Sequence, residues 1–305
     1  MKTATPQCEA FAVELGLDLW ALIDAVGVPV VEVRQVTTIP AAHGERGSFR
    51  VTFADGQILK ARRLRTPSDA ERVARLSSLL DPQVFPPVLA HRGRGLLTRW
   101  IPGVDVRNGD WTPRDLRTCG RVHATIHRLP ITGDMALLRR APVRSEQRLS
   151  ELLDELVQRR ALDTWQADAV RSLTSLAAPP TERIAVCHRD FCGDNIVIGA
   201  DGQVCVVDNE GMTIDSPEYD LARTWYRWPM TPDQQRAYAE GYGVHAHVAR
   251  FAERFVHWAL IVLVESATFR ARMGAASVRV PLERLTDLLD TDGRNESFPR
   301  ILHRG

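Results

Sequence analysis

The sequence predicts an α+β protein with a small β-rich N-terminal lobe and a larger helical C-terminal lobe. Strand-like segments and a hairpin signal dominate residues 30–101, whereas helical periodicity dominates the chain after Gly103. One compact β segment, residues 184–211, returns within the helical part. A chain of 305 residues with 44% hydrophobic residues is long enough to bury the core of both lobes.

The N-terminal lobe is expected over residues 1–98, as an N-terminal helix, an antiparallel sheet and one further helix. Gly27 ends the first helical pattern, Ala54-Asp55-Gly56 predicts a hairpin turn, and Pro82 follows the second helix. In chain order, we expect a helix over 9–25, strands over 30–39, 49–53 and 57–64, and a helix over 68–80.

A hinge is expected over residues 99–103, because Pro102-Gly103 punctuates the chain after a short apolar run, and the helical lobe then covers 104–305. Thr112-Pro113, Ser145 and Asp163 are typical residues at the start of a helix. The expected helices are 114–129, 145–160, 163–176, 219–228, 231–242, 247–273 and 281–289.

Composition excludes several classes of protein. The 39 basic and 38 acidic residues leave a net charge of +1, which gives no strong field for nucleic acid or anionic lipid. The longest apolar run, residues 258–264, is too short to span a bilayer, and the first residues lack a signal-peptide pattern. Five cysteines without a CxxC pair indicate neither a disulfide framework nor a zinc site. We therefore expect a cytoplasmic protein without nucleic-acid or membrane partners; the oligomeric state stays open.

The embedded β segment carries the clearest chemical pattern. Residues 188–195 read HRDFCGDN, of the form HxDxxxxN, and Asp208 follows Asn195 by thirteen residues at the end of an apolar run. Phosphoryl transfer from ATP requires a carboxylate that accepts the proton of the attacking hydroxyl, and amide and carboxylate oxygens that hold Mg²⁺. Asp190 is then the base, and Asn195 and Asp208 are metal ligands. Each residue alone is also an ordinary turn residue, but the ordered set favours the chemical interpretation.

These segments resemble a known family. HRDFCGDNIVI, VVDNEG and DSPEYDLA are similar to the aminoglycoside phosphotransferase and choline kinase group, whose members share the protein-kinase-like fold. The resemblance implies an enzyme that transfers phosphate from ATP, with Mg²⁺, to a hydroxyl of a small molecule such as an aminoglycoside-like antibiotic or a related metabolite. It implies that Asp190 is the catalytic residue and that Asn195 and Asp208 are magnesium ligands. It also implies that Asp220 braces the catalytic loop from the start of a helix.

Three departures separate this chain from protein kinases. Cys192 stands where those enzymes carry a lysine, Asp208-Asn209-Glu210 replaces DFG, and Ser216-Pro217-Glu218 follows too closely for an activation loop. Glu210 either adds a carboxylate to the metal site or caps a turn. A small-molecule kinase is the first hypothesis; a non-catalytic nucleotide-binding pseudokinase and an atypical protein kinase are the alternatives.

The N-terminal lobe carries candidates for nucleotide binding. Lys60 is the only lysine besides Lys2 among the 39 basic residues, and the resemblance places a phosphate-binding lysine on this strand. Glu71 is the candidate partner of Lys60, although Ser68-x-x-Glu71 is also a capping box. Residues 40–48, which include Ser48, are the candidate for a loop that covers the phosphates. Thr98, Trp100 and Ile101, at the hinge, are candidates for contact with adenine.

The histidines and the acceptor site are less defined. We expect His188 to be structural, and His123 and His127 to pack rather than bind metal, because no third ligand stands nearby in the sequence. An acidic set would favour a cationic acceptor, but a charge run on a helix is usually a solvated face. The candidates are Glu151, Asp154, Glu155 and Glu218, with Trp225, Tyr226 and Trp228 as an aromatic alternative. The acceptor and a role in antibiotic resistance stay open.

Overall fold

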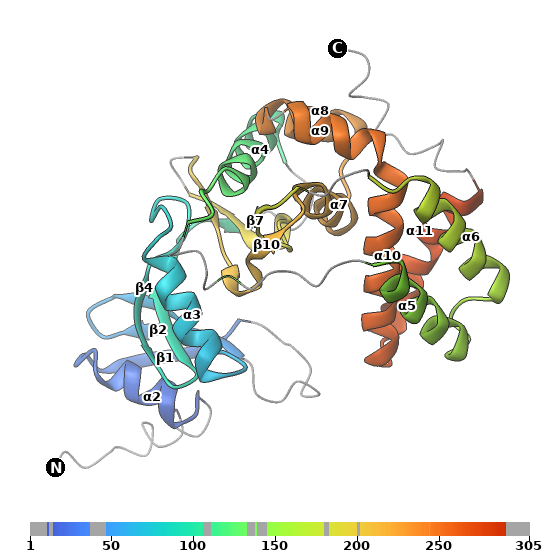
Figure 1. The fold of residues 1–305 in the computed structure, drawn as a ribbon. Coiled ribbons are helices and arrows are strands. Elements are labelled where there is room, and N and C mark those ends of the chain that lie inside the picture. The colour runs from blue at the N-terminus through green and yellow to red at the C-terminus, as the bar shows by residue number, and fades with distance from the viewer. Residues whose placement is uncertain are drawn as a thin grey trace. The chain divides into compact units, whose positions relative to one another are not determined.

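The computed structural model of the chain describes residues 11, 15–36, 47–105, 111–132, 138, 145–179, 183–199, 202–243 and 245–290. The chain divides into two compact units (Figure 1). The first comprises Met1–Asp105 and Ile196–Glu210, and the second comprises Val106–Asn195 and Gly211–Gly305. The first unit is rich in strands and the second in helices, which confirms the predicted α+β class. The lobe boundaries at residues 98 and 103 remain a proposal.

An antiparallel five-stranded sheet forms the centre of the first unit. The strands are β1 (Val30–Gln35), β2 (Gly47–Phe53), β3 (Ile58–Arg63), β4 (Val88–Arg92) and β5 (Gly95–Arg99), in the order β1-β2-β3-β5-β4. The sequence pattern did not predict β4, which is short, half-exposed and preceded by two prolines. A smaller sheet joins β6 (Val104–Asp105), β8 (Ile196–Ile198) and β9 (Val204–Val206).

The alternation along β3 determines which of its residues are available for chemistry. Leu59 and Ala61 are buried in the hydrophobic cluster between the sheet and helix α2 (Leu17–Asp24). Successive side chains of a strand point to opposite faces, so Lys60 and Arg62 share the other face. Helix α3 (Pro67–Ser77) packs against this second face through a separate hydrophobic cluster.

Two helix starts differ from the predictions. The helix expected over residues 9–25 is interrupted at Gly16, which has a φ of 81°, and α2 begins after it. Phe11 and Leu15 are also helical, but residues 9, 10 and 12–14 lie outside the described part. The N-cap of α3 is Thr66, whose side chain accepts a hydrogen bond from the backbone of Asp69. The alternative of a capping box that begins at Ser68 is therefore wrong: Ser68 already lies within the first turn.

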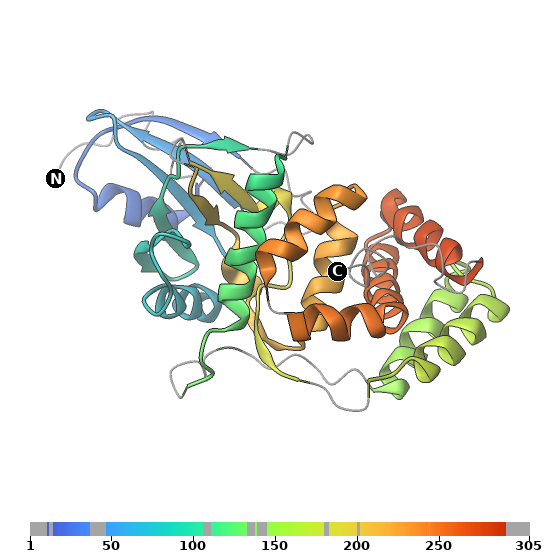
Figure 2. The same cartoon turned by 90° about the horizontal axis from the view of Figure 1, so that it is seen from above.

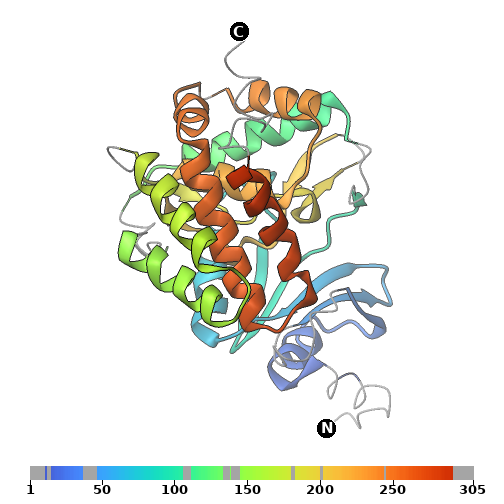
Figure 3. The ribbon, with the colours of Figure 1, turned by 90° about the vertical axis from the view of Figure 1, so that its right-hand side faces the viewer.

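Helices make up most of the second unit. They are α4 (Pro113–His127), α5 (Glu146–Gln158), α6 (Thr164–Leu176), α7 (Pro217–Arg227), α8 (Pro232–Tyr242), α9 (His245–Glu253), α10 (Phe255–Arg272) and α11 (Arg279–Asp290). The predicted N-caps Thr112, Ser145 and Asp163 are confirmed. The long helix expected over 247–273 is divided at Arg254 into α9 and α10. Helices α5 and α6 lie beside α10 and α11 (Figure 3). No helix in the described ranges is both long and apolar enough to cross a bilayer.

Helices α4 and α8 approach each other closely (Figure 2). A Cβ atom at Gly120 would collide with the backbone oxygen of Tyr238, and one at Gly241 would collide with the backbone oxygen of Arg117. The two glycines therefore permit a helix contact that a larger residue would prevent. This contact brings the His123 and His127 side chains of α4 to the tyrosines of α8.

Candidate active site

In the second unit, the HxDxxxxN segment joins β7 (Ala185–Cys187) to a 3₁₀ turn, η3 (Gly193–Asn195). β7 pairs with β10 (Thr213–Asp215), so the segment starts from a fixed strand. The amide nitrogen of Asn195 donates to the backbone oxygen of Asp190 at 2.8 Å and to its Oδ2 at 3.0 Å. Because the nitrogen is used in this way, the amide oxygen of Asn195 is the atom that it offers to a cation.

Two arginines of α7 hold the second oxygen of the Asp190 carboxylate. Arg227 Nε lies 3.1 Å and Arg223 Nη2 3.3 Å from Asp190 Oδ1. Burial disfavours the charged form of Arg227, but Asp190, Cys192 and Asp194 together outweigh it and raise the pKa of the guanidinium. The Asp190 side chain is 36% exposed, so the oriented carboxylate stays accessible.

The backbone before Asp190 is held in an unusual conformation. Arg189 has a φ of 66°, in the left-handed region that non-glycine residues seldom adopt. Its N–H donates to Asp220 Oδ1 at 2.7 Å, and its carbonyl oxygen accepts from Arg223 Nε at 2.9 Å. Such strain persists only where surrounding contacts over-determine it, and it is typical of functional loops.

Asp220 fixes the loop as the resemblance implied. It is fully buried, and its Oδ2 accepts a hydrogen bond from the backbone N–H of His188 at 2.8 Å. The same oxygen lies 3.0 Å from Nε2 of His123 and 3.1 Å from Nε2 of His127. Burial alone would raise the pKa of Asp220, but the hydrogen bonds from the two histidines hold it well below its usual value. Burial lowers the pKa of His123 to about 4, so this imidazole is neutral near pH 7.

The expectation that His123 and His127 lack a nearby third ligand is wrong, because the fold brings Asp220 to both. Their Nδ1 atoms are engaged by the hydroxyls of Tyr238 and Tyr242. Each ring therefore bridges a tyrosine and the carboxylate, and we interpret the cluster as a hydrogen-bonded brace. His188 is fully buried, in agreement with its expected structural role.

In the first unit, a cluster of charged side chains surrounds Asp208. Lys60 Nζ lies 3.1 Å from Asp208 Oδ1, and Arg62 Nη2 lies 3.4 Å from the same oxygen and 2.5 Å from Glu210 Oε1. Burial lowers the pKa of Lys60 although Asp208 opposes the shift. Burial also disfavours the charge of Arg62, but the carboxylates of Glu210 and Asp208 prevail and raise its pKa.

The Asp208–Glu210 segment fits a cation. Asp208 has a φ of 63°, and Arg72 of α3 donates to the backbone oxygen of Glu210 at 2.8 Å, so contacts on both sides fix the turn. Within the described chain, Oε2 of Glu210 is buried without a hydrogen-bond partner. An oxygen in that state, with the carboxylate of Asp208, matches the all-oxygen ligand sets that Mg²⁺ prefers.

The remaining residues that are predicted to bind the nucleotide lie on the sheet or directly after it. Thr98 faces Lys60 across β3 and β5, and Ser48 faces Arg62 across β2 and β3; both are buried. Trp100 and Ile101 follow β5 and are half-buried. Glu71 is exposed on α3, and no ion pair joins it to another described residue, so the structure does not bring it to Lys60. Residues 40–46 of the expected phosphate loop lie outside the described part.

The comparisons with known proteins agree with this geometry. The model of the phosphotransferase enzyme family matches residues 35–257, which is well over half of the chain. The chain belongs to this family. That membership confirms the family resemblance seen in the sequence and the predicted class of enzyme, a small-molecule phosphotransferase. A search of the curated proteins finds no match.

Solved structures share the fold of this phosphotransferase at low sequence identity. A type I macrolide 2′-phosphotransferase is 16% identical with a TM-score of 0.66, over 93% of this chain and 99% of that one. A choline/ethanolamine kinase family protein from Mesorhizobium loti is 16% identical with a TM-score of 0.61, over 90% and 93%. A spectinomycin phosphotransferase in complex with ADP and spectinomycin is 12% identical with a TM-score of 0.57, over 95% and 98%. They confirm the protein-kinase-like fold.

Sequence reasoning missed the arginines of this phosphotransferase that hold the carboxylates. The arginine-rich composition offers no contrast that would single out Arg62, Arg72, Arg223 or Arg227. The acidic acceptor candidates, in contrast, are already paired: Glu151 with Arg148, Asp154 with Arg171, Glu155 with Arg159 and Arg272, and Glu218 with Arg250. The aromatic candidates Trp225, Tyr226 and Trp228 are buried.

Proposed function

We propose that this phosphotransferase uses ATP and Mg²⁺ to phosphorylate a hydroxyl group of a small molecule. The observation that carries the proposal is the accessible carboxylate of Asp190, oriented on one oxygen by Asn195 and on the other by Arg223 and Arg227. A carboxylate fixed in this way can orient an acceptor hydroxyl and accept its proton.

The reaction assigns the residues as follows. The acceptor oxygen forms a bond to the γ-phosphorus, the bond from that phosphorus to the β–γ bridging oxygen breaks, ADP leaves, and the acceptor proton passes to Asp190. Lys60 binds phosphate oxygens, and Thr98, Trp100, Ile101 and Ser48 belong to the nucleotide site. Asn195, Asp208 and Glu210 would hold magnesium, which neutralises charge on the phosphates when it is bound.

The acceptor is one of several classes of small molecule. Solved structures of the same fold include enzymes named for macrolides, spectinomycin, and choline or ethanolamine, and we propose an acceptor from such classes. A cytoplasmic location and a role in antibiotic resistance stay predictions.

The test combines two variants with a matched control. Asp190→Ala is expected to abolish acceptor-dependent ADP formation with little change in nucleotide binding, because its carboxylate acts on the acceptor. Asp208→Asn is expected to weaken ATP affinity far more with magnesium than without it. Asp194→Asn, an exposed carboxylate in the same loop, should retain most of the activity. Retained turnover in Asp190→Ala would remove that residue from its role, and magnesium-dependent ATP binding without turnover of any acceptor would favour the pseudokinase.

A further inference from the structure

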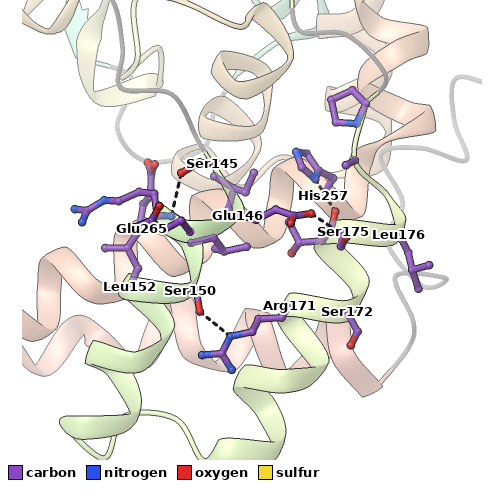
Figure 4. Close-up of a pocket in the computed structure, with 17 residues that line it drawn as sticks. Ser145, Glu146, Ser150, Leu152, Arg171, Ser172, Ser175, Leu176, His257 and Glu265 are labelled. Atoms are coloured by element: carbon purple, nitrogen blue, oxygen red, sulfur yellow. Dashed lines mark hydrogen bonds between the residues drawn. The ribbon is translucent and has the colours of Figure 1, made fainter.

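A pocket of about 830 Å³ lies between α5, α6 and α10, within the second unit (Figure 4). Residues around Ser145–Leu152 form one wall, residues around Arg171–Leu176 form another, and His257, Ile261 and Glu265 contribute from α10. Pockets of this size bind drug-sized organic molecules.

The lining combines aliphatic side chains with hydroxyl groups. Leu152 and Ile261 are almost fully buried at the pocket, and Leu149 lies beside them on α5. Ser150 of α5, whose hydroxyl accepts a hydrogen bond from Arg171 Nε at 3.2 Å, and Ser172 of α6 add hydroxyl groups (Figure 4). Aliphatic lining favours the burial of an apolar ligand surface, and a few hydroxyls fix its orientation.

The arginines that line the pocket are paired with acids that lie outside its lining. Arg171 is paired with Asp154 at 2.5 Å and Asp168 at 2.7 Å, and Arg148 is paired with Glu151 at 2.8 Å; none of these three acids lines the pocket. These cations are therefore neutralised from outside.

Two carboxylates line the pocket near the start of α5. Glu146 accepts from the hydroxyl of Ser175 at 3.0 Å and pairs with no cation among the described residues. Glu265 accepts from the hydroxyl of Tyr219. This end of the pocket (Figure 4) suits a single positive group on a ligand.

The α10 wall is connected to the catalytic loop. Tyr219 also contacts the guanidinium of Arg189, which lies 5.4 Å from the centre of its ring. Next to Glu265, Ser266 lies 3.5 Å from Arg223, and Arg223 donates to Asp190 at 3.3 Å. Ser266 does not line the pocket, but it belongs to the same helix as Glu265, so α10 carries both a residue of the pocket wall and a contact to the arginine that holds the proposed base.

We infer that this pocket binds the acceptor and that the acceptor is an amphipathic amine, with an apolar body and one positive group, rather than a polycation. The inference rests on the proposed function for the reaction that the acceptor undergoes. A polycation would need several unpaired acids, whereas the acidic face of α5 is already paired with arginines.

Ligand binding to the full chain without nucleotide tests the inference separately from turnover. Calorimetric titration uses two amphipathic amines of different size, erythromycin and propranolol, and the polycation kanamycin. At least one amphipathic amine is expected to bind, at least tenfold more tightly than kanamycin. Ser150→Trp, which fills the pocket, should abolish this binding, whereas Gln158→Trp at the other end of α5 should not.

A substitution of Glu146 tests the charge of the pocket. Glu146→Gln is expected to weaken binding of the amine about fivefold, as for a partly exposed ion pair, and the exposed Glu240→Gln on α8 should have no effect. Absence of binding by both amines, binding unaffected by Ser150→Trp, or tighter binding of kanamycin would overturn the inference. Because no outcome depends on phosphoryl transfer, an inactive enzyme that still binds the amine would contradict only the proposed function.

Discussion

Replacement of Arg62 by glutamine tests the charged group on β3. The Arg62 side chain is 10% exposed and lies 2.5 Å from Glu210 and 3.4 Å from Asp208. Removal of one partner of a buried ion pair leaves the other charge uncompensated, at a cost of about 3–5 kcal/mol. Glu210 is 27% exposed, so water recovers part of this loss, and we expect Arg62→Gln to lower the free energy of unfolding by about 2–3 kcal/mol.

Arg50 on the neighbouring strand provides a matched control. It pairs with Glu32 at 3.1 Å, but the side chains are 28% and 52% exposed. Arg50→Gln should therefore change the free energy of unfolding by about 0.5 kcal/mol or less. Urea denaturation of both variants gives the comparison, with the denaturant slope as a check on the unfolded state. A loss below about 0.5 kcal/mol for Arg62→Gln would refute the reasoning.

Four further outcomes are expected. The pKa of His123 is about 4 in the folded chain and 6.5 in the free side chain, so the unfolded chain binds more protons between these pH values. The free energy of unfolding should therefore fall by about 2 kcal/mol from pH 7.5 to pH 5. Denaturation at each pH measures this fall, which should be smaller in His123→Asn. Burial raises the pKa of Cys192 to about 11, so iodoacetamide at pH 8 should modify it only after unfolding, as peptide mass spectrometry would show. Arg227→Gln should lower kcat roughly 10-fold to 100-fold with little change in nucleotide affinity, because Asp190 loses its orientation; unchanged steady-state kinetics would contradict this. Gly120→Ala should destabilise the fold by about 1–3 kcal/mol in thermal or urea unfolding, because its Cβ meets the backbone of α8.

The sequence predicted features that depend on local patterns. Thr112, Ser145 and Asp163 cap helices because capping requires only neighbouring residues. Lys60 was expected on a strand because the Ala54-Asp55-Gly56 turn joins two strand-like segments. Asp190 and Asn195 were expected on one loop because apolar segments flank it on both sides.

Features that depend on distant parts of the chain were not predictable from one sequence. The pairing of Arg62 with Glu210 joins residues 148 positions apart, and that of Arg227 with Asp190 joins residues 37 apart. The contact of His123 with Asp220 requires α4, α7 and β7 to be placed first. The start of α3 was placed at the wrong residue, because Thr66 and Ser68 are both suitable N-caps and the local sequence does not distinguish them.

The most direct measurement follows the labelled γ-phosphate of ATP in a mixture of the enzyme, magnesium and a panel of hydroxyl-bearing acceptors. Transfer of the label to one acceptor by the native chain, with loss of that transfer in Asp190→Asn and its retention in Asp194→Asn, is the predicted result. Equal transfer by the native chain and Asp190→Asn would contradict the assignment of Asp190 as the base. Label found only in the protein itself or in a protein substrate would contradict a small-molecule acceptor.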